Sequence, residues 1–266
     1  IKAFHQAQYP EDVVVETTPG VVCELKHAPL ASVGLYIPGG TAPLPSTVLM
    51  LGATAQVAGC ARKVICTPPN KKGKVAVEIL YAASLCDIDE IYLVGGAQAI
   101  AALALGTDSI IKVDKIFGPG NSYVTEAKQQ VSLIPAGPAI DMPAGPSEVL
   151  VIADEHANPV FVAADLLSQA EHGTDSQAVL VSSSDELIKA VKHQVTLQLK
   201  TLSRQTIAEK AVQHSRYILT NTIEQAYEVS NAYAPEHLIV QVENARDSLN
   251  KLTNAGSIFV GQWSPE

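Results

Sequence analysis

The sequence predicts an α/β protein built from two Rossmann-like domains with parallel sheets. Three observations predict this fold: short apolar runs alternate with helix-length segments, turns of small residues separate them, and the alternation restarts after a Pro/Gly-rich stretch at 134–146. Short apolar strands followed by helices of about 10–15 residues are typical of parallel βαβ units. None of the turns contains G-x-G-x-x-G, so the usual dinucleotide fingerprint is absent.

The first half of the chain contains four strand–helix units. Each expected strand is a short run rich in Val, Ile, Leu or an aromatic residue, and a turn containing Gly or Pro separates it from the next helix. The expected strands cover 33–37, 63–67, 90–94 and 114–117, and the expected helices cover 46–59, 75–86, 97–105 and 121–131.

The second half repeats this alternation. Its expected strands cover 148–153, 178–182, 217–220, 237–240 and 257–260, and its expected helices cover 159–172, 184–199 and 223–233. Pro159 suits the first turn of its helix, where no backbone N–H group is needed. We assign 36–143 to one domain, and 1–35 together with 144–266 to the other.

Composition and charge exclude several classes of function. With 266 residues, 47% of them hydrophobic and 17% charged, the chain can form a sizeable core. Its net charge of −9 repels phosphate groups, so we expect no binding to nucleic acid or to a membrane surface. Apolar stretches are interrupted well before the ~20 residues of a membrane span. Residues 1–6 lack the features of a signal peptide and read like the middle of a helix, which indicates a truncated chain.

The four cysteines indicate a reducing compartment. None of them forms a C-x-x-C pair, and a chain of this size does not need disulfides, so we expect free thiols in the cytoplasm. They are Cys23, Cys60, Cys66 and Cys86.

Three Gly-containing turns follow strands and open helices, at 38–40, 95–98 and 118–121. Glycine lets a ligand approach the backbone, and a helix N-terminus offers free N–H groups to an anion. Gln98 and Asn121 lie at such helix starts and could hydrogen-bond a nucleotide at the carboxyl end of the sheet. Ordinary βα turns, in which Gly is common, are the simpler explanation of the same residues.

Gln169 and His172 are three residues apart on a predicted helix and would therefore share one face. His is a good zinc ligand, and Gln is an unusual one. The alternative is a plain helix C-terminus, where the helix dipole favours His172 and Gly173 caps the helix.

Glu236 and His237 lie just before a predicted strand. An acid beside an imidazole could act as a general acid–base pair, because both groups can be tuned towards neutral pH. A loop salt bridge is the simpler interpretation of the two residues alone. Ser147 could bind a substrate or merely serve a turn, and Asp141 could structure the crossing between the domains.

Several stretches, taken in order, closely resemble the histidinol dehydrogenase family. They are 34–40 (GLYIPGG), 95–101 (GGAQAIA), 115–121 (KIFGPGN), 140–148 (IDMPAGPSE), 165–173 (DLLSQAEHG) and 235–238 (PEHL). Single stretches could recur by chance, whereas the ordered set over nearly the whole chain is specific.

The resemblance implies a zinc-dependent enzyme of histidine biosynthesis that oxidises L-histidinol to L-histidine through histidinaldehyde, reducing two NAD in turn. It implies that NAD contacts Tyr36, Gln98 and Asn121. It further implies that Ser147 binds the substrate, that Gln169 and His172 bind zinc and lie at the substrate, and that Glu236 and His237 are catalytic and contact the substrate. The second predicted domain would thus carry the zinc and acid–base residues, and the family's enzymes are homodimers.

The resemblance also implies residues that the chain lacks. In the family, a zinc-ligating Asp follows a few residues beyond Glu266, and a further His ligand and a substrate-binding Glu come from the dimer partner. A weakly active or inactive core that only binds NAD is therefore a second hypothesis. A third is another NAD enzyme, such as an aldehyde dehydrogenase, which would need a catalytic Cys that no motif here provides.

Overall fold

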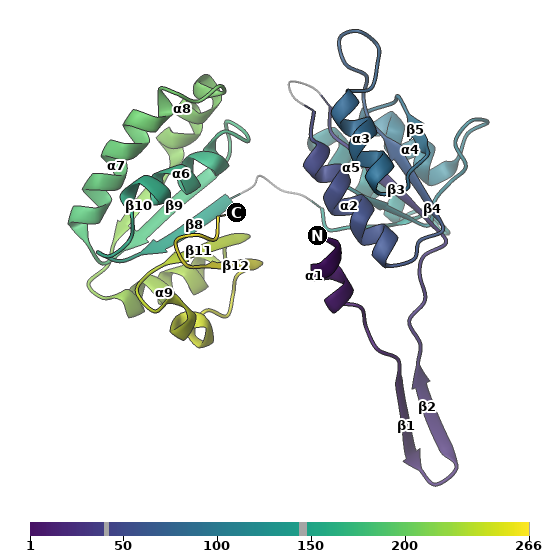
Figure 1. The fold of residues 1–266 in the computed structure, drawn as a ribbon, viewed down its shortest axis with the longest axis horizontal. Helices are drawn as coiled ribbons and strands as arrows, with labels where there is room; N and C mark the ends of the chain where they lie inside the picture. The colour runs from purple at the N-terminus through teal and green to yellow at the C-terminus, as the bar shows by residue number, and fades with distance from the viewer. Residues whose placement is uncertain (40–42, 144–147, 266) are drawn as a thin grey trace. The chain divides into compact units, whose positions relative to one another are not determined.

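The computed structural model describes residues 1–39, 43–143 and 148–265 (Figure 1). Contacts divide the chain into two compact units, Ile1–Ala144 and Gly145–Glu266. Each unit contains a five-stranded sheet in which all neighbouring strands are parallel, so the predicted α/β class with two parallel-sheet domains is confirmed.

The sheet of the first unit has the strand order β5-β4-β3-β6-β7. Its strands are β3 (Ser32–Tyr36), β4 (Arg62–Cys66), β5 (Glu90–Tyr92), β6 (Lys115–Phe117) and β7 (Ala139–Ile140). Its crossover helices are α2 (Pro45–Val57), α3 (Val77–Leu85), α4 (Gly96–Leu105) and α5 (Ser122–Ser132). One apolar core lies between the sheet and α2 with α3, and a second lies between the other sheet face and α4 with α5, as βαβ crossovers require.

The sheet of the second unit has the order β10-β9-β8-β11-β12. Its strands are β8 (Glu148–Ala153), β9 (Gln177–Ser182), β10 (Arg216–Leu219), β11 (His237–Gln241) and β12 (Ser257–Val260). Its helices are α6 (Pro159–Ala170), α7 (Asp185–Leu199), α8 (Gln205–His214) and α9 (Ile223–Tyr233), with the 3-10 helix η1 (Ala245–Lys251). Helices α6 and α7 cover one face of the sheet, and α9 with η1 covers the other.

The first 35 residues lie in the first unit, whereas we assigned them to the second domain from the sequence. Helix α1 (Lys2–Ala7) contacts α2, and β3 already begins at Ser32, where it pairs with β4. Strand pairing between distant segments decides this membership, and a local pattern cannot reveal it.

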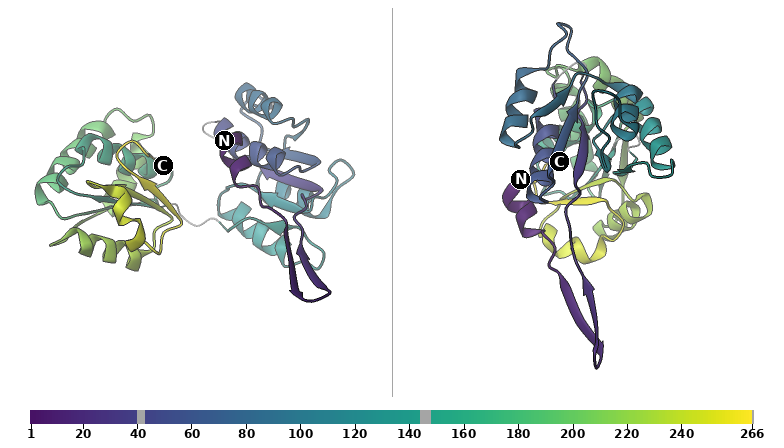
Figure 2. Two further views of the ribbon diagram at one scale, coloured as in Figure 1. Left: turned by 60° about the horizontal axis from the view of Figure 1, so that its bottom comes forward. Right: turned by 90° about the vertical axis from the view of Figure 1, so that its right-hand side faces the viewer.

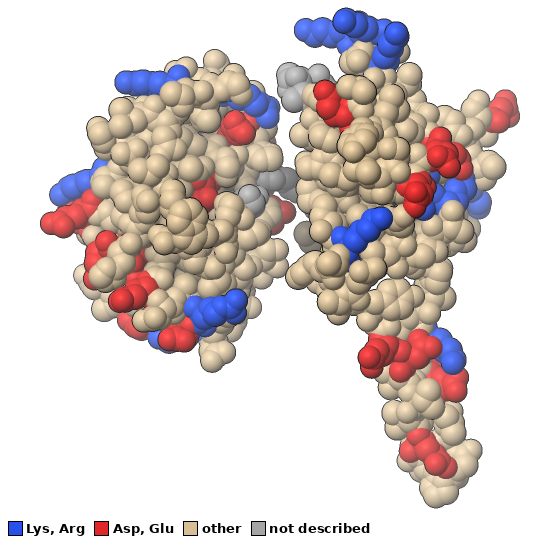
Figure 3. Space-filling model, in the orientation of Figure 1, with Lys and Arg blue, Asp and Glu red and all other residues tan. Residues whose placement is uncertain are grey.

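Between α1 and β3 the chain forms a hairpin, β1 (Val13–Thr18) with β2 (Val21–Leu25), which extends away from the sheet of its unit (Figures 1 and 2). Every residue of both strands is exposed. Because side chains alternate along paired strands, Val13, Val15, Cys23 and Leu25 lie together on one face of the hairpin. Acidic side chains also lie along the hairpin (Figure 3).

At the amino end of the first sheet, Arg62 donates two hydrogen bonds of 2.8 Å to Glu90, from Nε to Oε1 and from Nη2 to Oε2. The hydrogen bonds from Arg62 hold the pKa of Glu90 below its ordinary value. A lowered folded-state pKa stabilises the protein above the ordinary carboxyl pKa, and the contribution is lost as the pH falls through the folded-state pKa.

Glu90→Gln should therefore lower the free energy of unfolding at neutral pH. The Glu90 side chain is 40% exposed, so solvent screening limits the loss to about 1 kcal/mol or less. Urea unfolding at several pH values should show parent and variant converging as the pH falls through the lowered folded-state pKa of Glu90. A difference that stays constant down to the most acidic pH would contradict this assignment.

Candidate functional site

In the first unit, the strand order places a topological switch point between β3 and β6. The chain proceeds outward from β3 through β4 to β5 and then returns to β6 on the other side of β3. Crossovers leave in opposite directions there, which opens a crevice at the carboxyl ends of the two strands. The three residues expected to contact a nucleotide lie on the segments that surround this point.

Tyr36 ends β3, and its side chain is only 4% exposed. Its hydroxyl accepts a hydrogen bond from the backbone N–H of Gly96 (3.1 Å), in the first turn of α4. Two residues further on, Gln98 is exposed, and its Oε1 lies 2.9 Å from where a Cβ on Gly96 would stand. Tyr36 thus connects the end of β3 to the helix start that carries Gln98.

The turn after β6 also touches Tyr36. Gly118 has φ +125°, and a Cβ there would lie 2.1 Å from the carbonyl oxygen of Tyr36, so only glycine fits. Asn121 is exposed, and its Oδ1 caps α5 by accepting from the N–H of Val124 (3.1 Å). The structure thus brings Tyr36, Gln98 and Asn121 to one end of one sheet, although Asn121 also has an ordinary capping role.

In the second unit, Glu236 and His237 lie at the amino end of β11. His237 begins the strand, and its Nδ1 is 3.2 Å from the carbonyl oxygen of Glu148 and 3.9 Å from Oε2 of Glu236. The two side chains therefore lie close enough to cooperate. Donation from Nδ1 to the Glu148 carbonyl selects the tautomer in which Nε2 carries the lone pair.

Glu148, at the start of β8, is a residue that the sequence analysis missed. Its Oε1 accepts the backbone N–H of Glu236 (3.2 Å), and its Oε2 accepts the hydroxyl of Tyr233 (2.8 Å). Burial, with the added effect of the Glu148 carboxylate, raises the pKa of Tyr233 to about 12, so this hydroxyl remains a donor at neutral pH. Glu148 thereby holds the Glu236–His237 segment through its side chain and its carbonyl.

Gln169 is 1% exposed on α6, and both polar atoms of its carboxamide lack a hydrogen-bond partner among the described residues. Helix α6 ends at Ala170, so His172 lies in the following turn and not on the helix face that the sequence predicted. His172 is exposed, and its N–H still bonds the carbonyl of Gln169 (3.2 Å).

Gln169, His172 and His237 lie on the same face of the second sheet and towards the same end of it. His237 and Gln241 alternate with Leu238 and Val240 on β11, and Gln241 donates to buried Asp165 of α6 (2.5 Å). Because α6 returns from the carboxyl end of β8 to the amino end of β9, Gln169 and His172 lie towards the end where His237 begins β11.

The remaining predicted residue, Ser147, lies outside the described residues. Among those that are described, no group of three or more His, Cys, Asp or Glu side chains could hold a metal ion. No helix in the described ranges has the length and apolarity to cross a bilayer.

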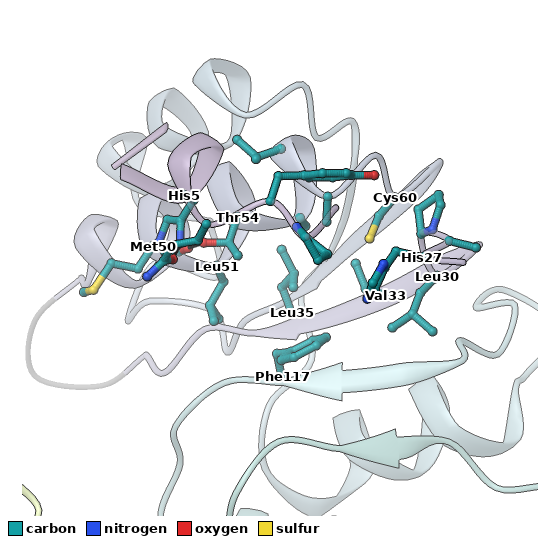
Figure 4. A pocket seen from close by; sticks show the side chains of 18 of the residues that line it. His5, His27, Leu30, Val33, Leu35, Met50, Leu51, Thr54, Cys60 and Phe117 are labelled. Atoms are coloured by element: carbon teal, nitrogen blue, oxygen red, sulfur yellow. Dashed lines mark hydrogen bonds between the residues drawn. The ribbon is translucent and has the colours of Figure 1, made fainter. Parts of the chain in front are cut away.

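A pocket of about 650 Å³ lies elsewhere, in the first unit. Leu35 and Phe117 reach it from the sheet, and Met50 and Thr54 reach it from α2 (Figure 4). None of the predicted site residues lines this pocket, so we place the chemistry by the strand ends and not by cavity size.

Comparison with known proteins supplies a family. The model of the histidinol dehydrogenase family matches residues 1–266. The histidinol dehydrogenase of Colwellia psychrerythraea is 64% identical over the whole chain, which spans 61% of that relative. The crystal structure of histidinol dehydrogenase from Elizabethkingia anophelis matches with a TM-score of 0.96 and 52% identity, covering 100% of this chain and 61% of the other.

More distant structures share the fold alone. One is an NAD-dependent benzaldehyde dehydrogenase from Corynebacterium glutamicum, with a TM-score of 0.58 and 12% identity, covering 97% of this chain and 69% of the other. At this identity the likeness concerns the arrangement of strands and helices and says nothing of substrate.

Proposed function

Because the chain belongs to the histidinol dehydrogenase family, we propose that the protein oxidises L-histidinol to L-histidine in two NAD-linked steps through histidinaldehyde. The chain spans about 61% of the length of the relatives it matches. The observation that carries the proposal is the anchoring of Glu236 and His237 by Glu148 at the amino end of β11.

In the first step the hydroxyl group of the alcohol must lose its proton while a hydride leaves the carbon that bears this group, so that the C=O bond of the aldehyde forms. Nε2 of His237 is the proposed base, since Nδ1 donates to the Glu148 carbonyl and the ring is thereby fixed in orientation. NAD, when bound, supplies the chemistry of hydride acceptance. Tyr36, Gln98 and Asn121 are the residues proposed to hold it, with Ser147 as a substrate ligand.

The second step needs water to add to the aldehyde before the next hydride can leave. Glu236 is the proposed base for this water, because its carboxylate is 44% exposed and reaches solvent while lying 3.9 Å from Nδ1 of His237. The imidazole of His237, which gains a proton in the first step, must release it to solvent before the next turnover. These roles divide the two proton transfers between two adjacent residues.

Zinc fits one observation of the structure. A buried carboxamide without partners is costly, and the oxygen of Gln169 could be satisfied by a metal ion at the end of α6. Gln169 and His172 are the residues proposed to hold it. When bound, zinc would orient the substrate through its amino and imidazole nitrogens.

Two side chains are few for a zinc site, which normally has three or four protein ligands. The second candidate function is a core that binds NAD and is weakly active or inactive. The test is NADH formation from histidinol, NAD and zinc, by this chain and by a version extended past Glu266. Turnover in either supports the proposed activity, and inactivity of both overturns it.

The cysteines oppose an aldehyde dehydrogenase mechanism that relies on a thiolate. Burial raises the pKa of Cys60, Cys86 and Cys66, that of Cys66 to about 12. Cys23 is exposed on the hairpin strand β2. Free thiols throughout the described chain agree with the proposed cytoplasmic location.

A homodimer is also part of the proposal. The exposed apolar face of the hairpin, with Val13, Val15, Cys23 and Leu25, is a surface that a monomer does not bury. Patches of this kind mark contacts with another chain. A partner subunit would cover it.

A further inference from the structure

An ion pair between a buried lysine and a partly exposed aspartate lies beneath the turn that follows β6. Lys128 of α5 is 3% exposed, and its ammonium group pairs with the carboxylate of Asp141, which follows β7. The same ammonium donates to the carbonyl oxygen of Gly118 (2.8 Å). Asp141 Oδ2 accepts the N–H of Gly118 (2.7 Å). The pair therefore holds both backbone polar groups of one glycine.

Stability alone does not account for this arrangement. Burying the ammonium of Lys128 costs desolvation free energy, and the side chain of its partner Asp141 is still 27% exposed, which weakens the attraction between the two charges. What the pair does supply is a fixed position for Gly118, whose backbone is pressed against the carbonyl of Tyr36. We call Lys128 and Asp141, with their bonds to Gly118, the clamp. The clamp joins the ends of β3 and β6, at the switch point.

The clamp also includes a residue of helix α5, the helix that starts at the 118–121 turn. Gly118 begins the turn, Asn121 caps α5, and α5 itself carries Lys128 back beneath Gly118. Any shift of the turn would break bonds to Lys128 or to Asp141. The ion pair, the turn and the helix start that carries Asn121 thus belong to one closed loop of contacts.

We propose that Lys128 and Asp141 are positioning residues for the cofactor, which hold the 118–121 turn in the geometry that NAD needs without touching NAD themselves. This inference rests on the proposed function, since it takes Asn121 and Tyr36 as NAD contacts. It adds two residues that the family resemblance did not assign a role.

Asp141→Asn separates positioning from charge. The variant leaves the ammonium of Lys128 without its carboxylate, and an added positive charge near the turn would by electrostatics alone tighten binding of an anionic nucleotide. Positioning predicts the opposite: NADH affinity falls about tenfold or more, as expected when a contact residue is misplaced. Lys128→Met should cause a similar loss, and Lys128→Arg should restore part of it.

The experiment is a fluorescence titration of the chain with NADH, with circular dichroism to confirm folding. The control is Glu90→Gln, which breaks the Arg62–Glu90 pair at the opposite end of the same sheet and should change NADH affinity less than twofold. If a single clamp variant does not fold, the double variant K128M/D141N leaves no lone buried charge and should show the same loss.

The NADH titrations distinguish a failed positioning role from a failed cofactor site. NADH binding by D141N that equals or exceeds parental binding overturns the positioning role, as does an equal loss in E90Q, which would mark a general effect of stability. A parent chain without saturable NADH binding overturns the proposed cofactor site together with this inference.

Discussion

Replacing His237 by Asn is expected to reduce histidinol oxidation by about 10²–10⁴-fold, the usual contribution of a general base. Asparagine can keep a donor near the Glu148 carbonyl, where Nδ1 of His237 lies 3.2 Å away, but it has no basic nitrogen. The fold should therefore persist while proton removal fails. Steady-state NADH formation measures the loss, in the 266-residue chain or, if that chain is inactive, in the version extended past Glu266.

A matched change of the neighbouring residue separates the two oxidations. Glu236→Gln keeps the backbone N–H that bonds Glu148, and removes only the carboxylate. It should slow the oxidation of histidinaldehyde more than that of histidinol, because only the second step consumes water. If H237N turns over within a few fold of the parent, His237 is not the base.

Gln169→Met is expected to stabilise the metal-free protein while abolishing its response to zinc. Both polar atoms of the Gln169 carboxamide are buried without a partner in the described part of the chain, a penalty of about 1–3 kcal/mol. Methionine has a similar length and no such atoms. Thermal unfolding with and without zinc should show a raised melting temperature in the variant and no further rise on adding zinc.

Gln241→Met is the matched control, since Gln241 is also a buried glutamine, at 3% exposure. Its Oε1 also has no partner among the described residues, but its Nε2 donates to Asp165, so its loss should lower stability and leave the zinc response intact. A metal-free Q169M less stable than the parent would mean that the carboxamide is satisfied in the native protein. An undiminished zinc response would remove Gln169 from the metal site.

Much of the fold could be predicted because its signals are local. Short apolar runs located β3, β4 and β8 within one or two residues, and the alternation of elements implied parallel sheets. The hairpin, α8 and the short strand β7 were missed. The hairpin buries nothing, and a pattern search for core-facing strands does not find it.

Some residues of the candidate site could likewise be predicted from local sequence, and others could not. Residue types and family motifs pointed to Gln98, Asn121, Gln169 and the Glu236–His237 pair, each within a short segment. They did not reveal Glu148, because its role depends on β8 and β11 lying side by side although 88 residues separate Glu148 from Glu236. They also placed His172 on a helix that ends two residues earlier.

The sequence by itself determined the α/β alternation, the places of the strand-end turns and the family, since all of these are written in contiguous residues. Only the tertiary structure decided that residues 1–35 join the first unit, that Lys128 and Asp141 clamp Gly118, and that Glu148 anchors His237. The physical reason is that strand order and buried charge pairing depend on contacts between distant segments. These contacts contribute their free energy only once the chain has folded.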